Sequence, residues 1–330
     1  MNEGQNRNEK SVATRPIWES AAQFYWKHLM IRCGSPGCSL RLKVQPALLA
    51  RFRGIHFNNR WYHEAACLKE ALVGQLKQML LSYGQSRNRA HRLPLGLLLV
   101  KRGAITPGEL REGLRLQRLA GTGKLGYWLR QITAIDEDQI CVALGQQWGC
   151  PVFPLDRHTL PPFTRYSPPY PLLAAAKAIP AFGTPDGRQW HIAFSERIDH
   201  TLLYALEEIL VCQTFACVSR ESAVNEALEQ FRKHTSGKEI CFDSVRDPGE
   251  MAATICSYAA QMDVRQLKVV RAGGHIWGAL FQRGARRDLL FRVPSVPDGR
   301  IVEPLLAQIK DYPPLADIRR DGVFDAAGPL

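Results

Sequence analysis

The pattern that decides the fold reads LPLGLLLVKRG at residues 93–103 and returns as GKLGYWLRQIT at residues 123–133, thirty positions later. A second matched pair follows, ELREGLRLQ at 109–117 and QICVALGQQ at 139–147. Self-similarity at a fixed period indicates two copies of one supersecondary unit. The sequence between Leu93 and Gln147 therefore predicts a doubled structural element.

Each copy is expected to be a short helix, a break and a second helix. Apolar residues recur four positions apart, which places them on one helical face; the pairs are Leu95/Leu99, Leu110/Leu114, Leu125/Leu129 and Ile140/Leu144. Thr106, Pro107 and Glu109 form a capping-box start for the second helix of copy one, and Asp136 is the matching cap in copy two. We expect the two units to pack as a small helical bundle.

The composition is that of an ordinary soluble protein, without an apolar run of the roughly 20 residues that span a bilayer. The polar start, Met1 to Lys10, lacks an apolar signal core, so a cytoplasmic location is expected. Nine cysteines, an odd number in a long chain, favour reduced thiols or a metal over a disulfide framework.

The net charge of +12 is concentrated near the N-terminus, because residues 1–92 carry fifteen Lys or Arg against five Asp or Glu. Such a basic region could contact nucleic acid, an anionic lipid surface or an acidic protein, or could be a solvated face. The charge alone does not choose between them.

Changes in composition predict an α+β multi-domain chain. The expected parts are a disordered tail (1–15), a zinc-knuckle domain (16–85), a basic linker (86–92), a helical tandem-repeat subdomain (93–150), a proline-rich extended connector (151–175), a small α/β subdomain (176–235) and a C-terminal αβββ module with a tail (236–330). Seven prolines between Pro151 and Pro171 are the reason for expecting an extended connector. One further helix is expected near residues 302–309.

The sharpest local signal is a set of metal-ligating residue types in two pairs. Cys33-Gly-Ser-Pro-Gly-Cys38 is a tight knuckle, and His63-Glu-Ala-Ala-Cys67 places two more ligands four apart at a predicted helix start. Four soft or borderline ligands suit tetrahedral Zn²⁺, and a closed set of three cysteines and one histidine indicates a structural site. The alternatives are free thiols beside a surface histidine, or His56 as a competing ligand. The region resembles a treble-clef zinc knuckle in its Trp-Tyr pair before the second ligand pair.

The doubled stretch resembles the MshEN domain, the N-terminal domain of type II secretion and type IV pilus ATPases (GspE N-terminal-like), over about residues 93–231. The resemblance rests on Leu-Gly-x2-Leu-x3-Gly-x6-Leu-x3-Leu-x2-Gln in tandem. In that family the motifs open with Arg-Leu-Gly and bind cyclic di-GMP in many members. The resemblance implies a ligand set in this chain of Arg92, Leu95, Gly96, Leu99, Gly103, Leu110, Leu114, Gln117, Lys124, Leu125, Gly126, Leu129, Ile140, Leu144 and Gln147.

Three positions depart from the family pattern. Pro94 and Lys124 stand where the motifs begin with Arg, and Thr133 replaces the later glycine of copy two. Lys124 keeps the charge but loses the planar fork of a guanidinium, and Arg92 could substitute in copy one. The motif therefore predicts either a cyclic di-GMP site or a helical scaffold without a ligand.

The sequence shows no nucleophile paired with a base, so it does not predict an enzyme. The stretch Gly121-Thr-Gly-Lys124 lacks the spacing of a phosphate-binding P-loop. We expect a non-enzymatic regulatory or adaptor protein without an ATPase motor, which could sense cyclic di-GMP and bind a protein of a secretion, pilus or motility assembly. The alternative is a zinc-dependent scaffold that binds nucleic acid or protein through residues 1–92.

Overall fold

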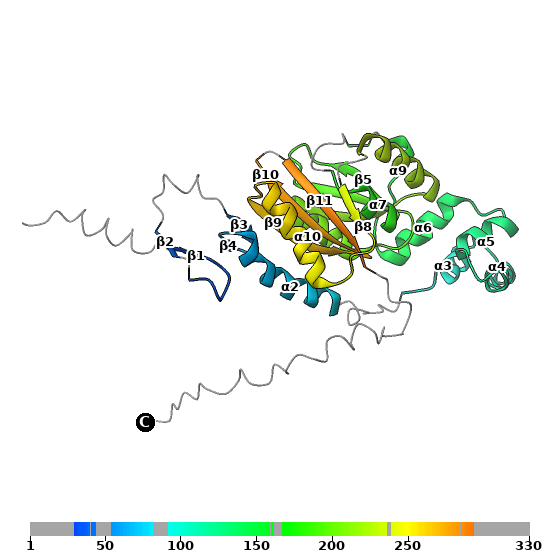
Figure 1. Cartoon of the computed structure of the whole chain (residues 1–330). Helices are drawn as coiled ribbons and strands as arrows, with labels where there is room; N and C mark the ends of the chain where they lie inside the picture. The colour runs from blue at the N-terminus through cyan, green and yellow to red at the C-terminus, as the bar shows by residue number, and fades with distance from the viewer. Residues whose placement is uncertain are drawn as a thin grey trace, which may run out of the picture.

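The computed structural model describes residues 30–39, 41–43, 54–81, 92–158, 160–161, 167–235, 239–283 and 285–293. The predicted tail (1–15), most of the basic linker (86–92) and the helix expected near residues 302–309 lie outside these ranges. The described chain is a mixed α and β structure, as predicted (Figure 1).

Four helices form the predicted helical subdomain, namely α3 (Leu95–Lys101), α4 (Pro107–Ala120), α5 (Leu125–Ile132) and α6 (Glu137–Trp148). Both expected caps are present as capping boxes: Thr106 Oγ1 accepts from the Glu109 N–H at 3.2 Å, and Asp136 Oδ1 accepts from the Gln139 N–H at 2.7 Å. The main packing crosses between the copies, because α4 packs on α5 and α3 on α6. Each copy therefore supplies half of one shared apolar core.

The small α/β subdomain is built from α7 (Tyr170–Ala176), β5 (Ala178–Gly183), β6 (Gln189–Phe194), α8 (His200–Leu210), β7 (Gln213–Val218) and α9 (Glu221–Thr235). Its sheet has the order β5-β6-β7, with β5 antiparallel and β7 parallel to β6. A short 3-10 helix, η3 (Leu155–Arg157), precedes it.

The prediction that residues 151–175 are extended throughout was wrong at two places, η3 and α7. Helix α7 starts at Tyr170 with Pro169 as its N-cap and a proline in its first turn. Proline is compatible with a helix start, because the first turn needs no backbone N–H donor and the ring presets φ.

A six-stranded sheet joins residues from the two ends of the described chain. Its order is β4-β3-β9-β10-β11-β8, and the strands are β3 (Ile55–Phe57), β4 (Arg60–Tyr62), β8 (Glu239–Phe242), β9 (Gln266–Ala272), β10 (His275–Gln282) and β11 (Ala285–Arg292). The contact between the two halves is the parallel pair β3–β9, where His56 lies opposite Gln266. The sequence predicted a separate N-terminal unit, whereas these strands share one sheet with the C-terminal module.

Both faces of this sheet are covered (Figure 1). Helices α2 (Ala65–Leu81) and α10 (Pro248–Gln261) pack together on one face, where Leu68, Leu72 and Leu76 of α2 are fully buried. The other face belongs to the core of the α/β subdomain, through alternate residues such as Trp277 and Leu290. A short hairpin, β1 (Met30–Arg32) with β2 (Arg41–Lys43), lies at the β4 end.

Among the described residues, no helix combines the length and apolar character that a bilayer crossing requires.

Candidate functional site

The first candidate site is the Cys–His cluster, and the structure brings together all four predicted ligands. Cys33 follows β1, Cys38 ends the knuckle, His63 follows β4, and Cys67 lies in the first turn of α2. The Gly34 N–H donates to the Trp61 carbonyl at 2.7 Å, which ties the knuckle to β4. Their ligating atoms all lie within 4.8 Å of one another.

The separations within the cluster fit a tetrahedral ion. His63 Nδ1 is 3.4 Å from Cys33 Sγ and 3.6 Å from Cys38 Sγ. Tetrahedral zinc with Zn–S near 2.3 Å and Zn–N near 2.0 Å places its N and S ligands roughly 3.6 Å apart. His56, the competing ligand, lies in β3 and lines a different hollow together with α2 and α8, outside the cluster.

A carboxylate supports the histidine from behind. His63 Nε2 is 3.3 Å from Glu64 Oε1, while Nδ1 faces the thiols. Metal-binding histidines usually donate their second N–H to a carboxylate or carbonyl, which fixes the ring orientation. The same carboxylate oxygen accepts a longer contact from Cys67 Sγ at 3.8 Å.

The thiols differ in their readiness to ionise. For Cys33, burial acts to raise the pKa, but hydrogen bonds from the Ser35 backbone and from His63 outweigh it and lower the pKa to about 7. For Cys67, burial and the neighbouring sulfurs of Cys33 and Cys38 raise the pKa to about 12. The thiolate form of Cys67 is therefore unfavourable in this cluster unless a cation balances its charge.

The second candidate site is formed by the heads of the two motif copies. Leu95 and Gly96 begin α3, which packs on α6, and Leu125 and Gly126 begin α5, which packs on α4. An ideal Cβ on Gly96 would lie 2.4 Å from Leu110 Cδ1, whereas one on Gly126 would meet Ile140 at 3.4 Å. Gly96 therefore permits close helix packing.

The two motif glutamines make a reciprocal contact between the copies. Gln117, at the end of copy one, donates from Nε2 to the Gly123 carbonyl at 2.9 Å. Gln147, at the end of copy two, donates to the Leu93 carbonyl at 2.8 Å. Gly123 and Leu93 hold equivalent positions, two residues before each motif leucine. Both amides therefore fix the head of the opposite copy.

The structure explains why copy two has Thr133 at the position where copy one has Gly103. Gly103 follows α3 with φ +70°, a left-handed conformation that favours glycine. Thr133 at the equivalent position has φ −132°, and its hydroxyl donates to the Leu129 carbonyl at 2.8 Å. The two helices thus end differently, so threonine at this position costs no backbone strain.

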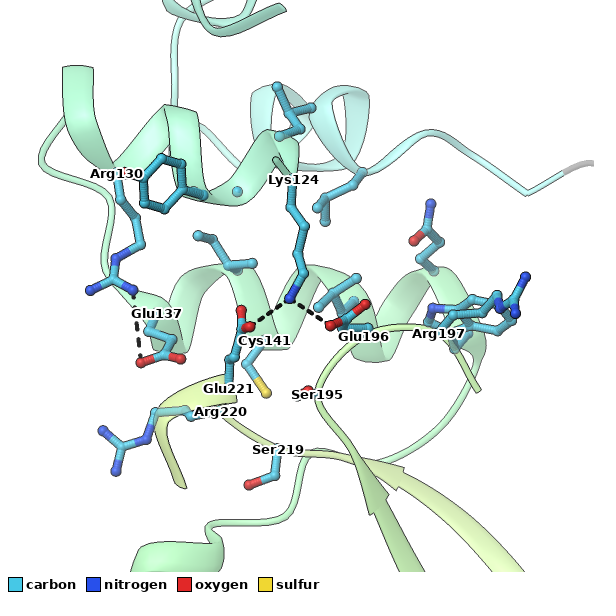
Figure 2. Close-up of a pocket in the computed structure, with 18 residues that line it drawn as sticks. Lys124, Arg130, Glu137, Cys141, Ser195, Glu196, Arg197, Ser219, Arg220 and Glu221 are labelled. Atoms are coloured by element: carbon cyan, nitrogen blue, oxygen red, sulfur yellow. Dashed lines mark hydrogen bonds and ion pairs between the residues drawn. The ribbon is translucent and has the colours of Figure 1, made fainter. Parts of the chain in front are cut away.

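The cations at the motif heads both have partners. Lys124 Nζ lies 2.7 Å from Glu196 Oε1 and 2.5 Å from Glu221 Oε1 (Figure 2). Burial acts to lower the pKa of Lys124, but these two ion pairs outweigh it and raise the pKa. The Arg92 guanidinium lies over the Trp148 ring, 3.7 Å from its centroid, in a cation–π contact.

A cavity of about 310 Å³ lies between the helical subdomain and the α/β subdomain (Figure 2). Seven of the residues that the motif implicated line it, namely Leu95, Lys124, Leu125, Gly126, Ile140, Leu144 and Gln147. The other implicated residues do not: Leu99 and Leu129 are fully buried in the bundle core, and Leu110 packs against that core. Gly96, Gly103, Leu114 and Gln117 are likewise absent from the cavity lining, and Arg92 reaches it only through Trp148.

The opposite wall was not predicted and comes from the α/β subdomain. Ser195, Glu196 and Arg197 follow β6, and Ser219, Arg220 and Glu221 follow β7. These strands are parallel, so their carboxyl ends meet at one edge of the sheet, the usual place for a ligand crevice. The parallel pairing was the signal that could have found them.

Ion pairs also bridge the two subdomains at the rim. Glu137 of α6 accepts from both the Ser222 N–H, at 2.9 Å, and its hydroxyl, at 2.8 Å. Arg220 reaches Asp156 at 2.7 Å and Asp138 at 3.5 Å. The wall of the cavity is therefore held by hydrogen bonds and charge pairs as well as by apolar packing.

The comparisons with known proteins are confined to solved structures, since no family model and no curated protein matches the chain. A structure of MshE with cdg, the abbreviation of cyclic di-GMP, is 24% identical, and the match covers 42% of this chain and 99% of that chain at a TM-score of 0.35. Two structures of the XpsE N-terminal domain match at 14% and 18% identity, covering 41% and 40% of this chain and 92% and 89% of theirs, with TM-scores of 0.32 and 0.26. The chain is similar to these structures over about two fifths of its own length.

Proposed function

We propose that this protein is a non-enzymatic regulatory or adaptor protein whose MshEN-like domain binds cyclic di-GMP. The observation that carries the proposal is the cavity, on which both motif heads and one motif glutamine converge, together with four cationic side chains. These are Lys124, Arg130, Arg197 and Arg220. An anionic dinucleotide needs apolar walls for its bases and cations for its phosphates.

The residues present supply both needs. Leu125, Ile140 and Leu144 give the cavity an apolar side on α5 and α6. Ser195, Ser219 and Arg197 line the opposite side. The stacked pair of Arg92 and Trp148 offers a planar surface at the edge, on which a guanine base would stack.

The competing charges predict a modest affinity. A phosphate that pairs with Lys124 must compete with Glu196 and Glu221, which hold its ammonium in the free protein. Breaking such contacts lowers the net gain from binding, since only the surplus over the lost interactions appears as affinity. The proposed site therefore couples ligand binding to a rearrangement between the two subdomains.

Isothermal titration of cyclic di-GMP into the full chain tests the proposal, with GTP as the comparison ligand. We expect saturable binding that Leu144→Asp weakens more than tenfold, because its carboxylate would face the cavity. The matched control is Leu119→Asp, whose side chain is 72% exposed on α4, and it should bind like the wild type. No binding by the wild type at high micromolar concentrations would refute the proposal.

The rival function is a scaffold without a dinucleotide, which binds nucleic acid or protein through the basic N-terminal region. One observation favours it: the motif amides and Lys124 already have internal partners. Deleting residues 1–92 is a poor test, because β3 and β4 belong to the six-stranded sheet and α2 packs on it. The double substitution Arg32→Gln and Arg60→Gln is a better test, because both side chains are exposed beside the knuckle. Salt-dependent DNA retention should fall in this variant if the rival function is right.

The cellular setting follows from the same proposal. A regulatory MshEN-like domain implies a protein partner in a secretion, pilus or motility assembly and a cytoplasmic location, where cyclic di-GMP would be available. Copurification with an assembly component that depends on cyclic di-GMP would support this setting.

A further inference from the structure

The Cys–His cluster lies outside the proposed dinucleotide site, and its geometry suits a metal ion. Its four ligating atoms converge within 4.8 Å, with N···S separations of 3.4 and 3.6 Å. The histidine is oriented by Glu64 on its far side. Metal-binding histidines almost always have such a partner for their second ring nitrogen.

The charge around the cluster also suits a bound ion. Three thiolates and a neutral imidazole around a divalent cation carry a net charge of −1. Arg32 and Arg60 line the same hollow as Cys33 and Cys38, so two cationic side chains lie beside this charge. A soft, sulfur-rich tetrahedral set selects zinc over calcium or magnesium, which take oxygen ligands.

The position of the cluster in the fold indicates what the ion would do. It lies where β4 ends and α2 begins, and Cys33 forms a β-bridge with Trp61 of β4. The elements on either side supply little independent core, because β3 and β4 are three residues each. The buried face of α2 packs against α10, and the Gln75 amide donates to the Val269 carbonyl of β9 at 3.0 Å.

We propose that Cys33, Cys38, His63 and Cys67 bind one structural Zn²⁺, and that this ion fixes β3, β4 and α2 onto the C-terminal strands β9–β11. The metal thus stabilises the packing of β3 and β4 against β9, β10 and β11, which lie far from them in the sequence. Its stability contribution is independent of any ligand in the cavity beside the repeat.

Metal content of the full chain, purified under reducing conditions without a polyhistidine tag, is the first measurement. We expect one zinc per chain by plasma mass spectrometry and no comparable iron. Replacement by Co²⁺ should give the visible absorption of a tetrahedral thiolate site. A metal content far below one per chain, or an octahedral cobalt spectrum, would overturn the proposal.

Ligand variants identify the site. Cys38→Ser and His63→Ala should lose the metal, whereas His63→Cys should retain it, because a set of four cysteines is equally suited to zinc. Cys241→Ser is the matched control, since Cys241 is an exposed thiol on β8 outside the cluster. Retention of stoichiometric zinc by both Cys38→Ser and His63→Ala would place the metal elsewhere and refute the assignment.

The structural role is tested on the wild-type chain, which avoids variants that fail to fold. Removing the metal with a chelator should speed amide hydrogen exchange in β3, β4, α2 and β9 while leaving β5, β6 and β7 unchanged. Readdition of Zn²⁺ should restore protection. Unchanged exchange in α2 and β9 after complete metal loss would refute the stabilising role, and uniform loss of protection across the chain would refute the proposed localisation of the effect.

Discussion

The Cys–His cluster and the cavity beside the repeat differ in how their reactive atoms are satisfied. In the cluster, three sulfurs and an imidazole nitrogen face one another, and a single cation would satisfy all four. In the cavity, Lys124 and Arg220 already pair with carboxylates across the subdomain boundary. A cation bound to the cluster would therefore not have to displace a cationic side chain. An anionic ligand of the cavity, in contrast, must compete with the carboxylates that already pair with its cationic side chains.

Metal removal should give the largest effect. A chelator should lower the free energy of unfolding by several kcal/mol, well beyond the roughly 1 kcal/mol of an average substitution, because structural zinc contributes directly to folding. Thermal unfolding with and without the chelator measures it. A melting temperature that does not move would erase the contrast between the two sites.

Removing the ion-pair partners of Lys124 should have the next largest effect, which is on the affinity for cyclic di-GMP. The double substitution Glu196→Gln and Glu221→Gln removes both competing carboxylates from Lys124 and should tighten cyclic di-GMP binding about tenfold, which is about 1.4 kcal/mol. Titration calorimetry gives the ratio to the wild type. Glu229→Gln, on the exposed face of α9, is the control and should not change affinity. Equal affinity in the double variant would mean that the ion pairs do not oppose binding.

The glycines of the two motif heads should respond unequally to alanine. Gly96→Ala should cost about 1 kcal/mol, because crowding against Leu110 outweighs the helix preference of alanine. Gly126→Ala meets Ile140 at an ordinary contact distance and should be neutral or stabilising by up to about 0.5 kcal/mol. Urea unfolding of both variants decides the matter, and the reverse order would show that Gly96 is not required for packing.

Loss of the hydrogen bonds between Glu137 and Ser222, which link the two subdomains, should have the smallest effect on stability. This effect should depend on pH. Burial acts to raise the pKa of Glu137, but the hydrogen bonds from Ser222 outweigh it and lower the pKa. A carboxyl with a depressed folded pKa stabilises the fold above its unfolded pKa of about 4.3, and this contribution is lost as the pH falls through the folded value.

Glu137→Gln should therefore cost less than about 1 kcal/mol at pH 7, and the cost should be smaller at pH 3. Urea unfolding of variant and wild type at both pH values measures the difference. Glu226→Gln, on the exposed side of α9, should show no such pH dependence. A constant difference between pH 7 and pH 3 would contradict the assignment.

Local patterns in the sequence predicted the local features. The repeat, its Thr106 and Asp136 caps, and the convergence of Cys33, Cys38, His63 and Cys67 depend on short spacings, which fix helix phase and turn geometry. The strands of the C-terminal module were predicted, but their union with β3 and β4 in one sheet was not, because β3 pairs with β9 across about 200 residues. Such pairing depends on the whole chain rather than on any window.

The cavity was predicted only on one side for the same reason. The motif named Ile140 and Leu144, which a helical period places on one face of α6. Glu196 and Glu221 enter the site through the parallel strands β6 and β7, and nothing in the residues around them marks a binding site. Their ion pairs with Lys124 change the expected chemistry most, and they follow from tertiary structure alone.

The shared sheet has a consequence for synthesis of the chain on the ribosome. The Gln75 amide and its acceptor on β9 are 194 residues apart. At about 5–20 residues per second, α2 is made roughly 10–40 s before the strands that cover it. During that interval the apolar face of α2 would be exposed to chaperones and to other nascent chains. An ion bound early by the knuckle would keep β4 and α2 in order while the rest of the sheet is still being made.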